Sequence, residues 1–236
     1  MSESSESAAG YLYLVRHGQG SLGTDNYDRL SSRGQSQSSL LGERLQIEVD
    51  RPFRTWSGSL RRHRQTLAGL GLNGEGQIEP ALNEYTVDAL IRSAVTQADS
   101  LGLRVPDARA FSEPVAYLAM FLEWFPEVLS VWQQGRLACI DNGSWSAFQS
   151  RVLSPVKQWQ LQLAGGGSVV VVTSAGVIST IVADLLGENL AWQRELNVCL
   201  YNASVTRLSL SDTGQWLAGP INCIEHLDGR DLQTLA

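Results

Sequence analysis

The sequence predicts an α/β fold with a mostly parallel β-sheet and an antiparallel edge. Short apolar runs that end at turn residues alternate with segments of helical periodicity in the first third of the chain. Residues 168–173 (SVVVVT) are β-branched after the first position, which is typical of a central strand buried on both faces. Strand-like runs at 199–210 and 215–221 are separated by SDTG, which indicates a hairpin. Strands that alternate with helices predict a parallel sheet, and the hairpin supplies the antiparallel edge.

The first third of the chain provides the alternating strands and helices. Ser31 or Ser32 is suited to cap the first helix, which we expect to run to about Glu48 with an apolar face. The second helix is predicted from Ser59 to about Leu70. The predicted strands of this part cover residues 11–15, 52–57 and 78–82.

The middle of the chain shows helical spacing and no clear strand. Helices are predicted at 90–101, 115–134 and 144–163, and another at 176–186, ending at a glycine. We interpret about 85–165 as a helical cap on a single domain of residues 11–236, preceded by a disordered tail of residues 1–10. The tryptophans of this segment are predicted to be core residues, with a substrate-pocket role for one of them as the alternative: Trp124, Trp132, Trp145 and Trp159.

Composition narrows the class of protein. The 236 residues, 43% of them hydrophobic, suffice for one large domain. A formal net charge of −6 does not favour binding to nucleic acid or to anionic membranes. Three cysteines (Cys139, Cys199 and Cys223) without metal-ligand spacing indicate reduced thiols in the cytosol. The polar N-terminus has no apolar segment of a signal peptide, so we expect a cytoplasmic protein with no membrane partner.

Basic residues follow two of the predicted strands. Arg16 and His17 come after the first strand, residues 57–64 after the second, and residues 173–176 after the valine-rich strand. Because ligands of open α/β sheets bind at the carboxyl ends of the strands, these groups are expected at one edge. Arginines, glycines and helix N-termini suit a dianionic phosphate. An imidazole there could attack phosphorus, and Glu84 could protonate the leaving group.

Several segments resemble, in chain order, the motifs of the histidine phosphatase superfamily, also called the phosphoglycerate mutase-like family. They are LVRHG, YDRLSSRGQSQSSLLGERL, WSGSLRRHRQTLAGL, LNEY, VVVVTSAGVI and YNASVTRL. The third resembles the pattern S-x-L-x-R-A-x-Q-T-A and the fifth resembles V-x-H-G-G-V. The resemblance covers most of the chain and implies a three-layer α/β/α sandwich with a helical cap.

The resemblance also implies roles for individual residues. His17 would be the phosphorylated nucleophile, and Glu84 would be the proton donor. Arg16 and Arg62 would hold the phosphoryl oxygens, with Gly18 and Ser174 completing the phosphate-binding group. No metal and no cofactor are expected.

Three positions depart from the family pattern. Ser174 falls where the family usually has its second histidine, and Gly23 falls where many members have Asn. RHGQ replaces the commoner RHGE, which argues against the mutase branch. Loss of one preorganised donor costs about 2.7–4 kcal/mol, or roughly 100- to 1,000-fold in rate. Since the other groups are retained, we expect a weakened enzyme, and we expect Ser174→His to raise its activity.

Other charged residues near the motifs receive structural interpretations. His63 follows Arg62, so on a helix it points about 100° away, and we predict a structural or solvent-facing residue. Arg61 and Arg64 are predicted to be solvated or paired with acids. His226 is predicted to lie in a C-terminal turn, with replacement of the second histidine as the less favoured alternative.

The favoured function is a metal-independent phosphatase that acts on a small phosphorylated substrate through a phosphohistidine. The alternative is a regulatory module of the same fold that binds a phosphorylated ligand or phosphate without turnover. Phosphoglycerate mutase activity is a weaker third hypothesis. The sequence does not name the substrate, and it leaves a homodimer open.

Overall fold

The computed structural model describes residues 10–21, 28–48, 53–73 and 75–235. The predicted tail therefore lies outside the described residues except for Gly10, and so does Gly23. Within the described residues the chain divides into two compact units. The sheet unit contains the residues up to Asn83 together with Ser154–Ser174 and Tyr201–Thr234. The helical unit contains Glu84–Leu153 and Ala175–Leu200, with Leu235.

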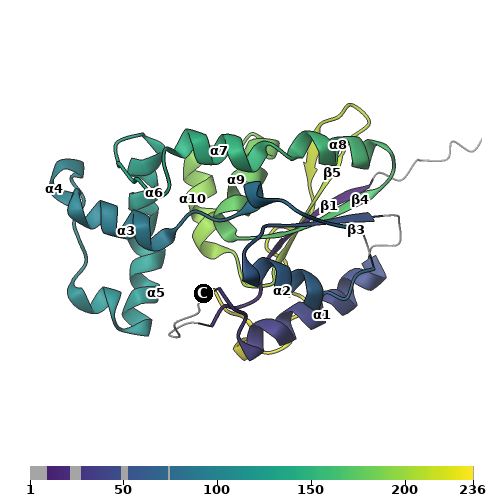
Figure 1. Ribbon diagram of the computed structural model, residues 1–236, viewed down its shortest axis with the longest axis horizontal. Helices are drawn as coiled ribbons and strands as arrows, with labels where there is room; N and C mark the ends of the chain where they lie inside the picture. Colours follow the sequence, from purple (N-terminus) through teal and green to yellow (C-terminus); the bar gives the residue numbers. More distant parts are fainter. Residues whose placement is uncertain (1–9, 22–27, 49–52, 74, 236) are drawn as a thin grey trace, which may run out of the picture. The chain divides into compact units, whose positions relative to one another are not determined.

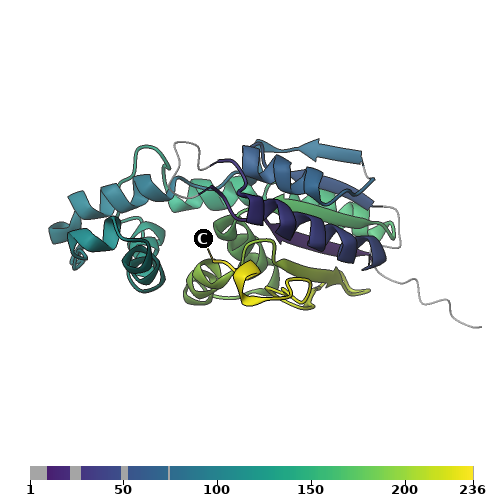
Figure 2. The ribbon, with the colours of Figure 1, turned by 90° about the horizontal axis from the view of Figure 1, so that it is seen from below.

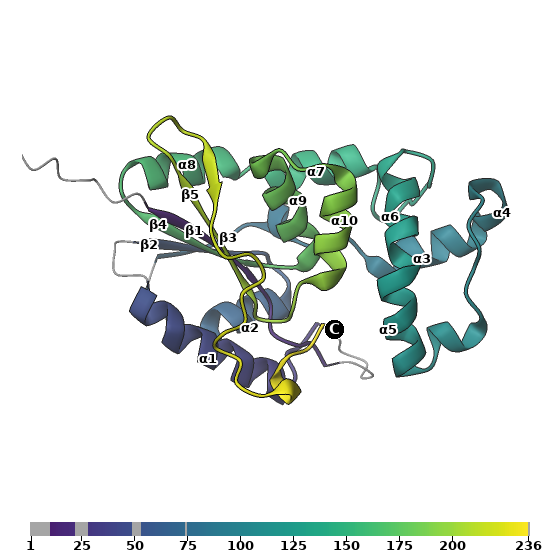
Figure 3. The ribbon, with the colours of Figure 1, turned by 180° about the vertical axis from the view of Figure 1, so that it is seen from behind.

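The sheet unit is built on one six-stranded mixed sheet (Figure 1). Its strand order is β3-β2-β4-β1-β5-β6, and the four strands from β3 to β1 are parallel. The final hairpin adds the antiparallel edge, which Figure 3 shows from behind. The predicted α/β class and sheet are therefore confirmed. The strands are β1 (Tyr11–Arg16), β2 (Phe53–Ser57), β3 (Glu75–Ile78), β4 (Ser168–Thr173), β5 (Val205–Leu210) and β6 (Trp216–Ala218).

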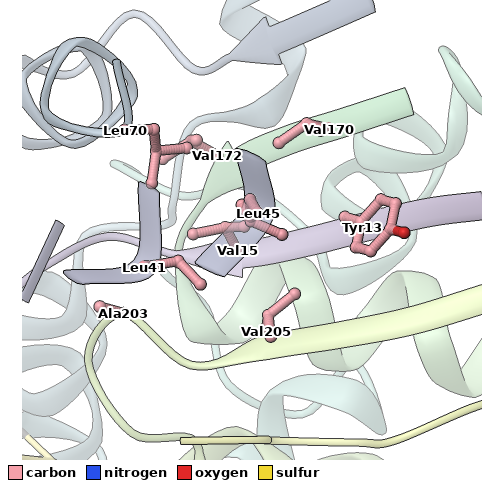
Figure 4. Close-up of a cluster of buried hydrophobic side chains, with 9 residues drawn as sticks. All are labelled: Tyr13, Val15, Leu41, Leu45, Leu70, Val170, Val172, Ala203 and Val205. Atoms are coloured by element: carbon pink, nitrogen blue, oxygen red, sulfur yellow. The ribbon is translucent and has the colours of Figure 1, made fainter. Parts of the chain in front are cut away.

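Helices cover both faces of this sheet. On one face, α1 (Ser32–Glu48) and α2 (Arg61–Gly69) lie side by side (Figure 2). Leucines of α1 and Leu70, which directly follows α2, pack on side chains of β1 and β4 in a buried cluster. Figure 4 labels its members: Tyr13, Val15, Leu41, Leu45, Leu70, Val170, Val172, Ala203 and Val205. On the other face, α8 (Val156–Ala164) packs against β4, β5 and β1. The sheet unit is thus a three-layer α/β/α sandwich, as the resemblance implies.

Buried aromatic rings hold α8 to the sheet. Trp159 of α8 and Trp56 of β2 are both almost fully buried, and their rings meet edge to face at 5.9 Å between centroids. Edge-to-face aromatic pairs add about 0.5–1.5 kcal/mol beyond the area that they bury. Trp159 is therefore a core residue, and the helix that carries it belongs to the sheet unit.

The helical unit has an aromatic core of its own. Trp132 is fully buried, and its ring contacts those of Tyr85, Trp145 and Phe148 at centroid distances of 5.2–5.7 Å. Trp124 is also buried, so these tryptophans are core residues as predicted. The helices are α3 (Val87–Thr96), α4 (Ala98–Leu101), α5 (Pro114–Glu123), α6 (Phe125–Gln133), α7 (Trp145–Leu153), α9 (Ala175–Leu186) and α10 (Leu190–Cys199).

One helical stretch, Val115–Gln133, is long and apolar enough to span a bilayer by length and composition alone. The core helices of soluble proteins pass the same test. Five side chains of α6 are buried inside the helical unit: Phe125, Val128, Leu129, Val131 and Trp132. The apolar character of α6 is therefore explained by core packing.

Several predicted elements differ from the structure. The helices expected at 90–101, 115–134 and 144–163 are each divided in two, into α3 and α4, α5 and α6, and α7 and α8. The strand expected at 78–82 ends at Ile78, and a short 3-10 helix, Pro80–Leu82, follows it. Proline has no N–H for a strand ladder, and the Glu79 carboxylate accepts from Ala81 N instead. The strand expected from Cys199 begins only at Val205, because α10 ends at Cys199 and a turn follows it, in which Ala203 has a φ of 54°. The signal for α10 is Asn189, whose side chain caps the helix by accepting from Trp192 N at 3.0 Å.

Candidate active site

His17 lies at the carboxyl end of β1 with a fixed ring orientation. Its backbone N donates to Thr173 O of β4 at 2.8 Å, which sets the position of the residue. Its Nδ1 lies 2.8 Å from Gly18 O. Because a carbonyl oxygen only accepts, this contact requires the proton on Nδ1. Nε2 then carries the lone pair and accepts from Arg62 Nε at 3.2 Å.

The surroundings of His17 favour its neutral form. The side chain is 3% exposed. Burial lowers the pKa of His17 well below 6.5, and the charges of Arg62 and Arg16 lower it further. The ring is therefore neutral at pH 7 and presents a lone pair at Nε2, which is the state that a nucleophile needs.

Arg62, in the first turn of α2, is held by an ion pair and by the helix. Its Nη1 lies 2.9 Å from Asp28 Oδ1, and Asp28 Oδ2 also accepts from the exposed backbone N of Arg61 at 2.8 Å. The carboxylate thus lies at the N-terminus of α2, where a negative charge is favourable. Asp28 was not singled out in the sequence analysis, because it lies 34 residues from Arg62.

Thr66 joins α2 to the loop that follows His17. Its buried hydroxyl donates to Arg62 O at 2.8 Å and accepts from Gly18 N at 3.0 Å. Gly18 packs so tightly on Gly34 that an added Cβ would overlap the backbone of Gly34. The resemblance to the Q-T element covered Thr66 but gave it no role. The structure shows that it holds the His17 loop against the helix of Arg62.

Ser174, the first residue after β4, is paired with His63. The Ser174 Oγ lies 2.7 Å from His63 Nε2, and the two side chains are 2% and 0% exposed. The His63 ring lies 5.6 Å from the ring of His17 between centroids. Burial lowers the pKa of His63 well below 6.5, and the charge of Arg62 adds to this. Both imidazoles are therefore neutral at pH 7.

The solvent-facing alternative predicted for His63 is wrong. The ring of His63 is fully buried and meets Ser174, which follows β4, so its turn away from Arg62 leads into the protein and not toward solvent. Gly58 makes room for it, since an added Cβ at Gly58 would overlap His63 Nδ1. Arg61 and Arg64 are exposed, as predicted. The contact to Ser174 is made by His63, not by His226.

Glu84 is the first residue of the helical unit, where its carboxylate meets the start of α9. Glu84 Oε2 accepts from Gly176 N at 2.8 Å, and Oε1 accepts from Tyr85 N at 3.1 Å. An added Cβ at Gly176 would lie 2.5 Å from Glu84 Oε1, so this contact requires glycine. Burial lowers the pKa of Arg151, and the Glu84 charge opposes that shift, which makes the two electrostatic neighbours.

The described residues contain no group of three or more His, Cys, Asp or Glu side chains that could hold a metal ion. The three cysteines are free thiols. The chemistry that the described geometry supports is attack by a neutral imidazole on an electrophile. The adjacent guanidinium of Arg62 suits an electrophile that carries negative charge.

The family model described as "Histidine phosphatase superfamily (branch 1)" matches residues 12–99 and 118–222 of this chain. A comparison of this chain with curated proteins found no match. Among solved structures, similarity extends to YhfR from Bacillus stearothermophilus, with 18% identity, coverage of 92% of this chain and 99% of the other, and a TM-score of 0.63.

Two further structures are named as phosphatases. One is the α-ribazole phosphatase from Shigella flexneri, with 16% identity, coverage of 91% and 96%, and a TM-score of 0.62. The other is the mycobacterial glucosyl-3-phosphoglycerate phosphatase in complex with inorganic phosphate, with 23% identity, coverage of 93% and 100%, and a TM-score of 0.60. At these identities the likeness shows a shared fold.

Proposed function

This chain belongs to the histidine phosphatase superfamily (branch 1), and from that premise we propose that it hydrolyses phosphomonoesters through a phosphorylated His17. The observation that carries the proposal is the state of the His17 ring. Nδ1 is tied to Gly18 O, and the lone pair of Nε2 meets the guanidinium of Arg62 at 3.2 Å. His17 can thus attack phosphorus while the adjacent Arg62 guanidinium binds the phosphoryl oxygens.

The proposed reaction has two steps. The Nε2 lone pair attacks phosphorus, the bond from phosphorus to the ester oxygen breaks, and Glu84 gives a proton to the leaving alkoxide. The Glu84 carboxylate then takes a proton from water, which attacks phosphorus and breaks the P–N bond. Inorganic phosphate leaves, and His17 returns to its neutral state. Arg62 and Arg16 hold the phosphoryl oxygens throughout.

We propose a small phosphorylated metabolite as the substrate. Two of the structures of the same fold are named as phosphatases of such compounds, an α-ribazole phosphate and a glucosyl-phosphoglycerate. The negative net charge of −6 does not favour a nucleic-acid substrate.

The test is release of phosphate from a panel of phosphomonoesters in the presence of EDTA. We expect turnover by the wild type and a loss on the order of 10⁴- to 10⁶-fold in His17→Ala, as when a nucleophile is removed. His226→Ala is the matched control, because it removes an imidazole elsewhere in the same unit. A wild type that binds inorganic phosphate without turning over any ester would instead be a binding module. Inhibition by EDTA that a divalent ion reverses would contradict the metal-independent mechanism.

A further inference from the structure

The mechanism above leaves the buried pair of Ser174 and His63 without a role. The two side chains come from different elements, the end of β4 and the first turn of α2, and meet at 2.7 Å. The His63 ring lies 5.6 Å from the His17 ring between centroids. Its other nitrogen, Nδ1, is buried and has no hydrogen-bond partner among the described residues. The pair is therefore buried and polar, one nitrogen of His63 is unpaired within the described part of the chain, and the pair lies beside the proposed nucleophile. This arrangement indicates a role in the proposed reaction.

The unfilled position of Nδ1 indicates which nitrogen carries the proton. If Nδ1 were protonated, a buried N–H would lack an acceptor, and the Ser174 hydroxyl would be used up in donating to Nε2. If Nε2 is protonated, it donates to Ser174 Oγ, and only an acceptor lone pair is left unfilled. Buried N–H groups without partners are rarer than under-satisfied acceptors, so the second tautomer is favoured. In that tautomer the Ser174 hydroxyl keeps its own proton for another acceptor.

The backbone places Ser174 next to the proposed nucleophile. Thr173, the preceding residue, accepts from His17 N at 2.8 Å, so Ser174 begins at the end of β4 beside the nucleophile. We propose that the Ser174 hydroxyl donates to the transferring phosphoryl group, and that His63 is a positioning residue whose Nε2–H holds the hydroxyl in that orientation. This inference rests on the proposed function. The pair would do together what a single histidine after β4 does in the pattern that the chain resembles.

The substitutions at the two positions complement each other in volume. The pattern S-x-L-x-R-A-x-Q-T-A has Ala at the position of His63, and the pattern V-x-H-G-G-V has His at the position of Ser174. One imidazole ring is therefore present at the two positions in either case. Ser174 is 2% exposed and its Oγ touches the His63 ring, so a second ring has no room there. The expectation that Ser174→His raises activity is therefore replaced. That change alone should overpack the site, and it should help only when His63 becomes small.

The first experiment measures the tautomers without turnover. The chain has three histidines, so ¹⁵N-labelled imidazoles can be assigned with His63→Gln and His226→Gln. At pH 7 we expect protonation of His63 at Nε2 and of His17 at Nδ1. Protonation of His63 at Nδ1 would overturn the proposal, because the Ser174 proton would then be spent on His63.

The second experiment is a cycle of three variants assayed with the best phosphomonoester of the panel. His63→Ala should lower kcat by about 10- to 100-fold, the usual effect of losing a group that orients a catalytic residue, with a smaller change in KM. Ser174→His should also lower kcat. The double variant His63→Ala/Ser174→His should recover to within roughly tenfold of the wild type, since one imidazole then fills the space. Additive losses in the double variant, or a folded His63→Ala protein with wild-type kcat, would overturn the proposal.

A third measurement separates failure of this inference from failure of the proposed function. If the wild type turns over no ester, the proposed function is wrong, and calorimetric binding of inorganic phosphate decides about the pair. Ser174→Ala should then raise the Kd for inorganic phosphate at least about tenfold. This result, together with the Nε2–H tautomer of His63, would still support the pair as the donor. Unchanged phosphate binding would overturn it.

Discussion

At the scale of single residues, the position of the proposed nucleophile, His17, depends on a side chain to which the proposed mechanism gives no chemical role. The Thr66 hydroxyl accepts from Gly18 N and donates to Arg62 O. One side chain thereby connects the loop after His17 with the helix of Arg62, the arginine that we propose holds the phosphoryl oxygens. Phosphoryl transfer depends on the alignment of the attacking and charge-stabilising groups. A small shift of His17 relative to Arg62 should therefore lower the rate as well as the stability.

Thr66→Val tests this connection. Valine has nearly the shape of threonine but leaves the buried Gly18 N–H without its acceptor, which should lower the free energy of unfolding by about 1–3 kcal/mol. We expect a lower Tm and a lower kcat. Thr66→Ser keeps the hydroxyl and serves as the control. Equal kcat values for the valine and serine variants would mean that the hydrogen bond does not align the site.

At the scale of secondary structure elements, the start of α9 holds the proposed acid. Gly176 is the second residue of this helix, and its N–H, which has no partner within the helix, donates to Glu84 at 2.8 Å. The close approach of the carboxylate depends on the missing Cβ. A helix N-terminus and a glycine together fix the position of a residue that lies 92 positions earlier in the chain.

Gly176→Ala should displace the Glu84 carboxylate and weaken general acid catalysis. We expect a fall of about 10²- to 10⁴-fold with alkyl phosphates, whose leaving groups need a proton, and a much smaller fall with p-nitrophenyl phosphate. Gly165→Ala is the control, because its new Cβ would meet no atom closer than 3.4 Å. If the two kinds of ester slow equally in Gly176→Ala, Glu84 is not the proton donor.

At the scale of the whole molecule, the two buried imidazoles make stability depend on pH. Both His17 and His63 have a pKa lowered well below 6.5, mainly because burial disfavours the charged ring. Between the folded-state pKa and 6.5, the unfolded chain binds protons that the folded chain does not. The free energy of unfolding therefore rises with pH in this window and falls as pH drops below 6.5.

Each of these histidines should contribute a slope of up to about 1.4 kcal/mol per pH unit to the free energy of unfolding. Urea unfolding at about pH 5.5 and pH 7 measures the slope. Since carboxylates also titrate toward acid pH, the informative quantity is the difference between wild type and His63→Gln, which should lose one histidine's share. His226→Gln should keep the wild-type slope. A wild-type slope that His63→Gln leaves unchanged would show that His63 is not held neutral by the fold.

The sequence by itself determined the class of fold and pointed to His17 as the candidate nucleophile. The valine run of β4 must be buried on both faces, and strands that alternate with helices must form a parallel sheet, whatever the loops do. The parallel register then brings the ends of β1, β2 and β4 to one edge, which is why the basic residues that follow these strands could be expected together. The fold class and the shared edge need only local periodicity and the order of elements, whereas the roles of His17 and Arg62 came from the resemblance of their motifs to a known family.

The tertiary structure alone decided how the polar side chains are paired. Periodicity states which face of α2 is buried, but it does not state which polar group a buried histidine will meet. His63 and Ser174 are 111 residues apart, and their contact depends on room that Gly58 leaves and on the exact packing of α2 against β4. A buried polar atom must find a partner of matching geometry, and that requirement is fixed by the assembled fold and not by the local sequence.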